Sequence, residues 1–417
     1  MARSTVNRKT APSSIIKDPT TALACTTLTG LTNVSTGTGT YSLTPNGPLD
    51  NNCISMSSSG ADISRFDYVL PTPLSFSRGI GVFVNYDALP ESVRYGTPYT
   101  ALTLYVLPVA GSFANYSTFS ISPQYFNGVY GSGPKGWMHI QMDYNSVRKA
   151  GFMSGVVNFN NPMQQIRLAT TTQYPLLVSN VHALGYNRPR IALTFDDGQI
   201  EDYTVVFPLL TARGLVGTTF IVEQLLNGTA YLSFAQLQEM YDAGWDVGCH
   251  GDGGDSWITS GLENRMRGIT KLISDKGWLR AAKIGASPGG AYSEKMVSQL
   301  ISQGFTRCFR TGPSTIAVTN NYQNAIAEDP RYVKNSLQKY FMYRQYCQTS
   351  TGDTSTSTIT QIDNAIKTGV DLTLGFHKID AGGTGQGWST TNFVAVIDAL
   401  AARVKAGLCD VVRVSDL

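Results

Sequence analysis

Acidic and imidazole side chains in the second half of the chain directly follow short apolar runs. The carboxylates are Asp196 and Asp197, and the imidazoles are His250 and His377. Carboxylates and imidazoles together bind divalent metals, and both transfer protons near neutral pH. The pattern therefore favours a site that binds a metal ion or transfers protons. The apolar runs that precede these residues are IALTF (191–195), WDVGC (245–249) and LTLGF (372–376).

Each of these residues also has an ordinary structural role. An aspartate at a strand end can cap a loop or a helix, and a lone histidine is often only a hydrogen-bonded polar group. Adjacent carboxylates repel one another unless a cation lies near, so Asp196 and Asp197 favour a cation between themselves and the histidines. The coincidence of all four side chains at the ends of apolar runs favours a site.

The elements that must position these residues alternate between strands and helices after residue 190. Ser233 and Gln236 fit a helix capping box. Continuous apolar strands alternating with helices predict a parallel sheet covered on both faces, and seven strands can close into a distorted (β/α)7 barrel. In such a barrel the chemistry lies at the carboxyl ends of the strands. The four remaining strand-like runs are GTTFIV (217–222), AKIGAS (282–287), RCFRT (307–311) and DVVRVS (410–415), and glycines that end predicted helices are Gly214, Gly244, Gly304, Gly369 and Gly407.

The chain before this region has another pattern. Short runs rich in Val, Ile, Tyr, Phe and Thr are separated by turn residues, which predicts an all-β sandwich or jelly roll over 21–188. We expect residues 1–20 to be a flexible segment and 189–417 to be the barrel. The runs are GTYSL, ISRFDYVL, IGVFVNYD, TALTLYVLPV, STFSIS, WMHIQMDY, SGVVNF and QIRLATT.

Composition narrows the class of protein. A chain of 417 residues is long enough for two cores, and 42% hydrophobic with 15% charged residues is typical of a folded protein. The net charge of +3 is small, so we expect no nucleic-acid partner. No apolar run reaches the length of a membrane span, and residues 1–21 hold no apolar region of the signal-peptide type. The localisation therefore stays open: we expect the protein either to be cytosolic or to leave the cell by another route, with a virion and release outside the cell as alternatives.

Six cysteines are present without a CxxC pair. A disulfide between Cys25 and Cys53 would close a plausible loop, but the alternative that we favour is buried thiols.

The segment TFDDG (194–198) resembles the first motif of the polysaccharide deacetylases, the NodB-homology group of carbohydrate esterase family 4. The resemblance extends over 188–417, with its motifs in order. The other segments that carry it are SFAQLQEMYDAGWDVGCH (233–250), GASPGGAYS (285–293), LTLGFHKID (372–380) and DVVRVSDL (410–417).

The resemblance implies metal-dependent hydrolysis of N-acetyl groups, or alternatively O-acetyl groups, on glycans. It implies that Asp196 is the general base, that Asp197 and His250 are metal ligands, and that His377 is the general acid. The metal expected for the family is zinc, with manganese, cobalt, nickel or magnesium as alternatives. The third motif implies substrate binding by Pro288, Gly290 and Tyr292.

The second motif departs from the family pattern, because Gly254 stands where the family has its second metal-binding histidine. Asp255 is our first candidate for the missing ligand and Asp252 is the other. The remaining alternatives are an extra water on the metal, or no metal. A carboxylate in place of an imidazole would favour harder ions such as manganese or magnesium.

The third motif also departs, because Ala286 lies near the position of the family's arginine, which often braces the catalytic aspartate. Arg307 or Arg310 on the next strand is a candidate replacement.

The leading hypothesis is a carbohydrate deacetylase that acts on an acetylated polysaccharide outside the cell, for example a phage tail-associated enzyme acting on capsule or host surface glycan. The first region resembles carbohydrate-binding jelly-roll modules, and a homo-oligomer or attachment to a virion are further expectations. The alternative is a glycan-binding or structural virion protein whose barrel is catalytically degenerate.

Overall fold

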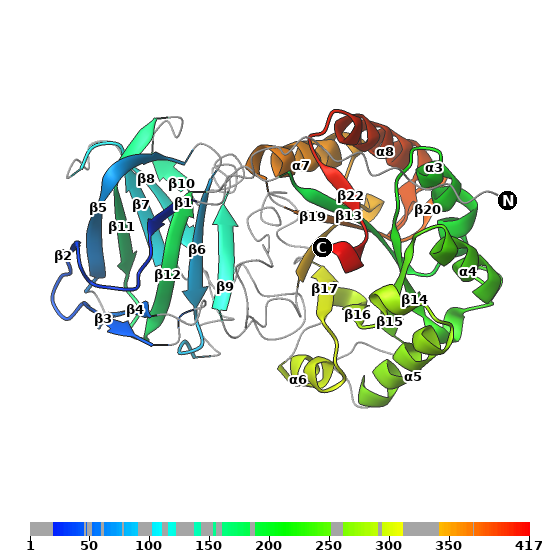
Figure 1. The fold of residues 1–417 in the computed structure, drawn as a ribbon, viewed down its shortest axis with the longest axis horizontal. Coiled ribbons are helices and arrows are strands. Elements are labelled where there is room, and N and C mark those ends of the chain that lie inside the picture. Colours follow the sequence, from blue (N-terminus) through cyan, green and yellow to red (C-terminus); the bar gives the residue numbers. More distant parts are fainter. Residues whose placement is uncertain are drawn as a thin grey trace.

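The computed structural model shows a β-rich part formed by the first half of the chain and a barrel formed by the second (Figure 1). The residues that the structure describes are 20–45, 47, 52–59, 62–76, 79–90, 102–110, 116–121, 137–142, 153–155, 161–183, 188–251, 262–290, 294–311, 342–369 and 371–417.

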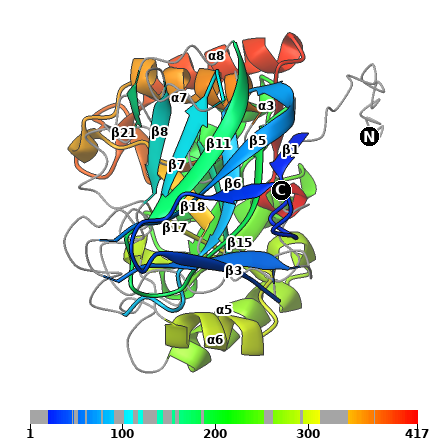
Figure 2. The same ribbon diagram turned by 90° about the vertical axis from the view of Figure 1, so that its left-hand side faces the viewer.

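The described residues of the β-rich part form two antiparallel six-stranded sheets, and Figure 2 views it with β5, β7 and β11 side by side. The first sheet has the order β3-β4-β12-β6-β9, with β1 paired to β12. Its strands are β1 (Thr20–Leu23), β3 (Thr40–Thr44), β4 (Cys53–Ser57), β6 (Ile80–Asn85), β9 (Trp137–Met142) and β12 (Leu176–Ala183). The second sheet has the order β10-β8-β7-β11-β5-β2. Its strands are β2 (Leu31–Asn33), β5 (Ser64–Ser75), β7 (Leu102–Leu107), β8 (Ser117–Ile121), β10 (Met153–Gly155) and β11 (Pro162–Thr170).

The core of the β-rich part lies between the sheets. Alternate residues of β7, such as Leu102 and Leu104, are fully buried there, as expected of a strand with one covered face. The two sheets are the all-β class predicted for this region, as far as the described residues show it.

The cysteines of the chain are buried thiols, and burial raises the pKa of Cys53 to about 11.

The described residues of the barrel form an eight-stranded parallel sheet with the order β14-β15-β16-β17-β18-β19-β13-β22. Because β13 pairs with both β14 and β19, seven of the described strands form a ring. The strands are β13 (Arg190–Asp197), β14 (Thr218–Val222), β15 (Asp246–Gly251), β16 (Ile284–Ala286), β17 (Arg307–Thr311), β18 (Met342–Tyr346), β19 (Leu372–Phe376) and β22 (Asp410–Val412).

The ring is distorted at the amino ends of its strands. There β22 pairs with β13 at Arg190–Ala192, whereas β14 pairs with β13 only from Thr194 onward. After β22, the Val414 amide donates to Thr218 Oγ1 on β14. The predicted run 410–415 is thus an additional strand that opens the ring, and the seventh strand of the ring is the unpredicted β18.

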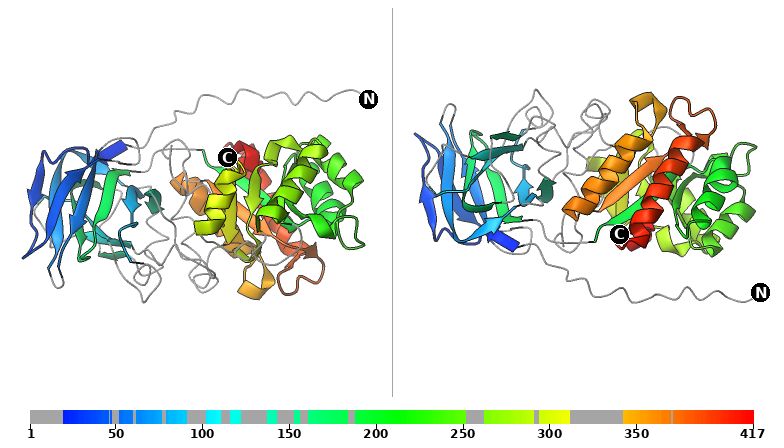
Figure 3. Two further views of the ribbon diagram at one scale, coloured as in Figure 1. Left: turned by 90° about the horizontal axis from the view of Figure 1, so that it is seen from below. Right: turned by 90° about the horizontal axis from the view of Figure 1, so that it is seen from above.

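Helices cover the outside of the ring, and α7 and α8 lie side by side there (Figure 3). The predicted capping box of α4 is present, with the Ser233 hydroxyl accepting from the Gln236 amide. The helices are η2 (Asp202–Val206, a π-helix), α3 (Phe207–Thr211), α4 (Phe234–Asp242), α5 (Leu262–Asp275), α6 (Glu294–Ser302), α7 (Ser355–Thr368) and α8 (Thr390–Lys405), with short 3-10 turns η3 (Glu223–Leu225), η4 (Leu279–Ala281), η5 (Pro288–Gly290), η9 (Thr349–Thr351) and η10 (Val414–Asp416), and a pair of short strands, β20 (Ile379–Asp380) and β21 (Trp388–Ser389). Among the described residues, no helix is both long and apolar enough to cross a membrane.

Side chains on opposite faces of each barrel strand join different cores. On β13, Leu193 and Phe195 belong to the large core shared with the helices, whereas Ala192 belongs to a small separate cluster. That cluster also contains Phe220, Ala281, Ile284, Ala286, Phe309, Val414 and Leu417. Because side chains alternate along a strand, Asp196 lies on the same face as Ala192, two steps toward the carboxyl end with Thr194 between them. An apolar plug therefore closes the interior below the candidate site.

Candidate functional site

Asp196 and Asp197 end strand β13, and the backbone turns sharply at this point. Asp197 has a φ of 72° and Gly198 a φ of 65°. A positive φ is unfavourable for a non-glycine residue, and strained residues of this kind cluster at functional sites. A Cβ on residue 198 would lie 3.2 Å from Ile221 Cγ2, so glycine suits the turn for both conformation and space. The turn leaves Asp196 fully buried and the Asp197 side chain 28% exposed.

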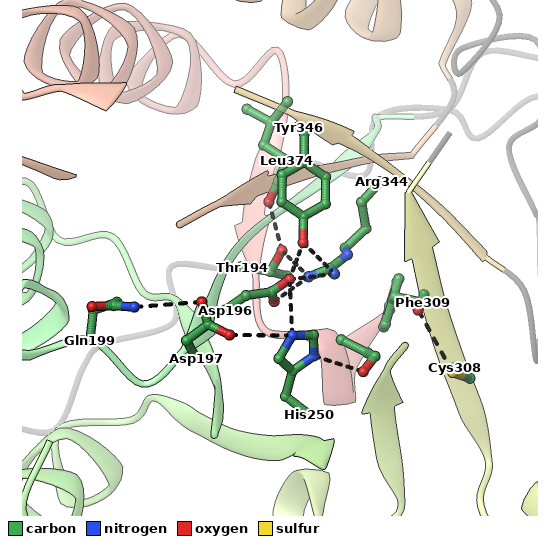
Figure 4. A network of polar contacts seen from close by, with 11 residues as sticks. Thr194, Asp196, Asp197, Gln199, His250, Cys308, Phe309, Arg344, Tyr346 and Leu374 are labelled. Carbon is green, nitrogen blue, oxygen red and sulfur yellow. Dashed lines mark hydrogen bonds and ion pairs between the residues drawn. The ribbon is translucent and has the colours of Figure 1, made fainter. Parts of the chain in front are cut away.

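His250 reaches the two carboxylates because β15 contains a bulge. The register of β15 against β14 passes from Cys249 to Gly251, so that His250 is the extra residue. A bulge of this kind changes the direction of a side chain. His250 Nε2 lies 3.5 Å from Asp197 Oδ1 and 3.9 Å from Asp196 Oδ2 (Figure 4).

The other ring nitrogen of His250 sets the tautomer. Nδ1 lies 2.8 Å from the carbonyl oxygen of Ala286, and a carbonyl only accepts, so Nδ1 carries the hydrogen. In the neutral ring, Nε2 then presents a lone pair to two carboxylates. Three electron-rich atoms converge, which is the arrangement expected around a cation.

Asp196 is held by two other side chains inside the ring. Arg344 Nη1 donates to Oδ1 at 2.7 Å and Nη2 donates to Oδ2 at 2.8 Å. The Tyr346 hydroxyl donates to Oδ2 as well. Burial raises the pKa of Asp196, but the charge of Arg344, aided by His250, outweighs burial and holds the pKa well below its usual range. Asp196 is therefore an ionised carboxylate inside the barrel.

Arg344 is itself fully buried on β18. Its guanidinium carbon lies 5.4 Å from the centre of the Phe220 ring, at the top of the apolar plug, and Nη1 also donates to Thr194 Oγ1 at 3.2 Å. Nε has no hydrogen-bond partner among the described residues. The sequence reasoning missed Arg344. Its signal was a charged residue flanked by Met342, Tyr343 and Tyr346 in an otherwise strand-like run.

The two arginines expected beside Asp196 are placed differently. Arg307 Nη1 donates to the Val414 carbonyl at 2.9 Å, and Nη2 donates to the Leu417 carbonyl, at the amino end of β17. The side chain of Arg310 lies outside what the structure describes. The positive charge that pairs with Asp196 thus comes from Arg344 on β18, the strand that follows β17.

His377 follows β19 on the same side of the barrel. The centre of its ring lies 4.9 Å from that of Tyr346, and its buried Nδ1 has no hydrogen-bond partner among the described residues. Burial lowers the pKa of His377, and the charges of Asp196 and Asp197 oppose this effect only in part. His377 is therefore mostly neutral near pH 7 in the absence of metal.

The other predicted site residues are only partly visible. Asp252, Gly254, Asp255 and Tyr292 lie outside the described residues. Pro288 and Gly290 form the short turn η5, which directly follows β16.

The fit of a metal rests on Asp197 and His250. Two ligands of one tetrahedral zinc, each about 2.1 Å from it, are about 3.4 Å apart, close to the 3.5 Å between Asp197 Oδ1 and His250 Nε2. Within the described parts of the chain, no group of three His, Cys, Asp or Glu is placed to hold a metal ion. The candidates for a third protein ligand, Asp252 and Asp255, lie outside the described residues.

Comparison with known proteins finds a family match in the part of the chain that contains Asp196, Asp197 and His250. Residues 185–308 match the family model described as polysaccharide deacetylase. The match includes Asp196, Asp197 and His250 but stops before β18 and His377, whereas the resemblance expected from the motifs extends to residue 417. No curated protein matches the chain.

Solved structures similar to the chain include two enzymes and a binding module. The Streptococcus pyogenes deacetylase PplD is 21% identical over 28% of this chain and 54% of its own, with a TM-score of 0.27. The family 4 carbohydrate esterase from Streptomyces lividans is 16% identical over 53% of this chain and 91% of its own, with a TM-score of 0.35. A family 11 carbohydrate-binding module from Clostridium thermocellum is 12% identical over 40% of this chain and 95% of its own, with a TM-score of 0.27. The chain thus spans about half the length of the first of these structures.

Proposed function

We propose that this chain, which contains a polysaccharide deacetylase domain, is a metal-dependent carbohydrate deacetylase that removes acetyl groups from an acetylated polysaccharide. The observation that carries the proposal is that Asp197 Oδ1 and Asp196 Oδ2 both lie within 3.9 Å of His250 Nε2. A buried arginine keeps Asp196 ionised beside them. An anionic base next to a cation site is what acetyl hydrolysis requires.

Asp197 and His250 would hold the divalent ion, with Asp255 as the proposed third ligand and Asp252 as the alternative. When bound, the ion polarises the acetyl carbonyl and lowers the pKa of its water. Zinc suits the pair of an imidazole and a carboxylate, and an additional aspartate would move the preference toward manganese or magnesium, with cobalt and nickel as further alternatives.

The remaining chemistry belongs to the side chains. Asp196, as an ionised carboxylate, accepts a proton from the attacking water through Oδ2, the oxygen nearer His250. A carbon–oxygen bond forms, the carbon–nitrogen bond of an N-acetyl group breaks, and acetate and a free amine result. His377 protonates the leaving nitrogen. Its lowered pKa makes the imidazolium a stronger acid but reduces the protonated fraction near neutral pH.

The short turn η5 after β16 is the proposed substrate-binding segment. Pro288 and Gly290 follow the strand that carries Ala286, the residue bonded to His250, so they are proposed to line the site together with Tyr292. The two-sheet region would hold the same polysaccharide. The proposed setting is a phage tail or another location outside the cell, where capsule or host surface glycan is the substrate.

Acetate release tests the proposal. Purified protein is supplied in turn with zinc, manganese, cobalt, nickel and magnesium, and incubated with N-acetylglucosamine oligomers and with an O-acetylated xylan. We expect acetate from the wild type and none from Asp196→Asn, while Asp242→Asn, a change on the exposed surface of α4, leaves the rate unchanged. Equal rates for wild type and Asp196→Asn would overturn the role of Asp196.

One observation favours a second candidate, a glycan-binding or structural virion protein with an inactive barrel. Gly254 occupies the sequence position at which the resemblance implies a second metal-binding histidine, and glycine has no side chain that could bind a metal. Glycan binding without metal uptake and without acetate release under any of the supplied ions would support this candidate.

A further inference from the structure

Tyr346, the last residue of β18, lies between the proposed base and the proposed acid. Its hydroxyl donates a hydrogen bond to Asp196 Oδ2 and accepts one from Arg344 Nη2 at 2.8 Å. Its ring lies against the His377 ring, with 4.9 Å between the ring centres and an angle of 37° between the planes. Tyr346 thus contacts both residues that the proposed reaction uses for proton transfer.

The ring of Tyr346 is fixed by its surroundings. Tyr346 pairs with Gly375 on the neighbouring strand β19. A Cβ on residue 375 would lie 3.1 Å from the Tyr346 ring, so a side chain there would press on it. On another side, the guanidinium carbon of Arg344 lies 5.0 Å from the ring centre. With only 9% of the residue exposed, the hydroxyl has little freedom to leave Asp196.

The hydroxyl adds a restraint that the arginine does not provide. Arg344 holds both oxygens of Asp196 in a fork, and its Nη2 is shared between Oδ2 and the tyrosine. Tyr346 donates only to Oδ2, the oxygen that lies 3.9 Å from His250 Nε2. Burial raises the pKa of Tyr346 well above its usual value, so the hydroxyl stays a donor throughout the neutral range.

We propose that Tyr346 is a positioning residue that holds Asp196 Oδ2 toward the metal side of the site and supports the ring of His377. The proposal rests on the proposed function for the roles of Asp196 and His377. Placement of the Asp196 carboxylate by Tyr346 is a structural claim that is measurable without activity.

The test compares Tyr346→Phe with Tyr203→Phe. Tyr346→Phe removes the hydroxyl and keeps the ring. Tyr203→Phe also removes a hydrogen-bonded hydroxyl, which donates to Glu239 at the protein surface. The loss of one hydrogen bond to a charged group predicts a kcat for Tyr346→Phe that is about 10- to 100-fold lower. KM and metal affinity should stay close to the wild-type values. The midpoint of thermal unfolding should fall, because a buried hydrogen bond to a charged group is lost, and Tyr203→Phe should match the wild type throughout.

Crystal structures of the wild type and Tyr346→Phe provide a readout that does not depend on activity. We expect Asp196 Oδ2 to move from its wild-type position, and an unmoved carboxylate overturns the proposal whether or not the protein is active. An unchanged kcat in an active protein overturns it as well, and so does a loss of metal affinity equal to the loss of kcat. Absence of acetate release from the wild type would reject the proposed function and leave the structural comparison to decide the role of Tyr346.

Discussion

Asp196 and Arg344 form an ion pair inside the barrel, with both side chains fully buried and two hydrogen bonds of 2.7 and 2.8 Å between them. Two charges removed from water in this way stabilise a protein little in total, but the loss of one partner leaves the other uncompensated. The pair therefore sets both the charge of the proposed base and the sensitivity of the barrel to substitution.

Replacement of Arg344 by methionine should lower the free energy of unfolding of the barrel. Breaking a buried pair typically costs about 3–5 kcal/mol, and urea unfolding at pH 7 measures it. Arg213→Met is the matched control, because Arg213 pairs with Asp398, whose side chain is 58% exposed. That pair should contribute at most about 1 kcal/mol. Equal losses for the two variants would contradict the account.

The stability of the wild type should fall below about pH 4 because of Asp196. Its pKa is lowered in the folded protein, so the folded state keeps the carboxylate ionised while the unfolded chain takes up a proton near its ordinary pKa of about 3.9. The stabilisation is complete above that pKa and declines as the pH falls further. Urea unfolding of wild type and Asp196→Asn from pH 6 to 3 should show their difference shrinking at low pH. A difference independent of pH would refute the assignment.

Asp202 should have the opposite effect. Burial raises its pKa well above the usual value, Asp197 and Asp196 add to the rise, and its only described partner is the Thr219 hydroxyl at 2.9 Å, which partly offsets it. The folded state keeps the proton that the unfolded chain releases above about pH 3.9, so stability is lost as the pH rises.

Asp202→Asn removes the loss of stability that the raised pKa of Asp202 causes at neutral pH, and the asparagine can still accept a hydrogen bond from the Thr219 hydroxyl. We expect the variant to be more stable than the wild type at pH 7, with an advantage that is smaller at pH 4. The surface change Asp242→Asn is the control for both pH values. Loss of stability in Asp202→Asn at pH 7 would show that the carboxylate is needed in its charged form.

Metal affinity should depend on Asp197 and His250. Removal of either ligand should weaken binding by about 100-fold or more, since changes to outer-shell partners alone cost about 10- to 100-fold. Calorimetric titration of the metal-free protein measures the affinity. His182→Ala is the control, because His182 is buried in the two-sheet region and its Nδ1 bonds to the Asn180 carbonyl. An equal loss in the control would mean that the metal binds elsewhere.

The same calorimetric titration identifies the third metal ligand. If Asp255 completes the site, Asp255→Ala should weaken binding as strongly as His250→Ala, and Asp252→Ala should bind normally. The reverse result would assign the ligand to Asp252. Unchanged affinity in both single variants would reject both assignments.

Sequence patterns predicted the barrel class and the strand ends that carry Asp196, His250 and His377, because these strands are short, apolar and followed by polar residues. They did not predict β18, since Arg344 and Gln345 interrupt its apolar pattern. Arg344 is stable in a buried strand because Asp196 reaches it across the ring. The local sequence marks Arg344 as a charged residue in a strand-like run, but it does not identify Asp196 on β13 as its partner.

Backbone geometry was also beyond the sequence patterns. The bulge at His250 depends on the register between β14 and β15, and the left-handed conformation of Asp197 depends on the packing of the following turn. The prediction that the run 410–415 forms one of the seven ring strands was wrong for a similar reason. Its apolar residues fit a ring strand, but β14 already pairs with β13 at the carboxyl end.

The most direct test of the central claim is acetate release from N-acetylglucosamine oligomers by wild-type protein that has been freed of metal and then resupplied with a single ion. The account predicts repeated turnover with metal, none in the metal-free protein, and none in Asp197→Ala at the same ion concentration. Folded wild-type protein that binds the ion and releases no acetate from these oligomers or from O-acetylated xylan would contradict it.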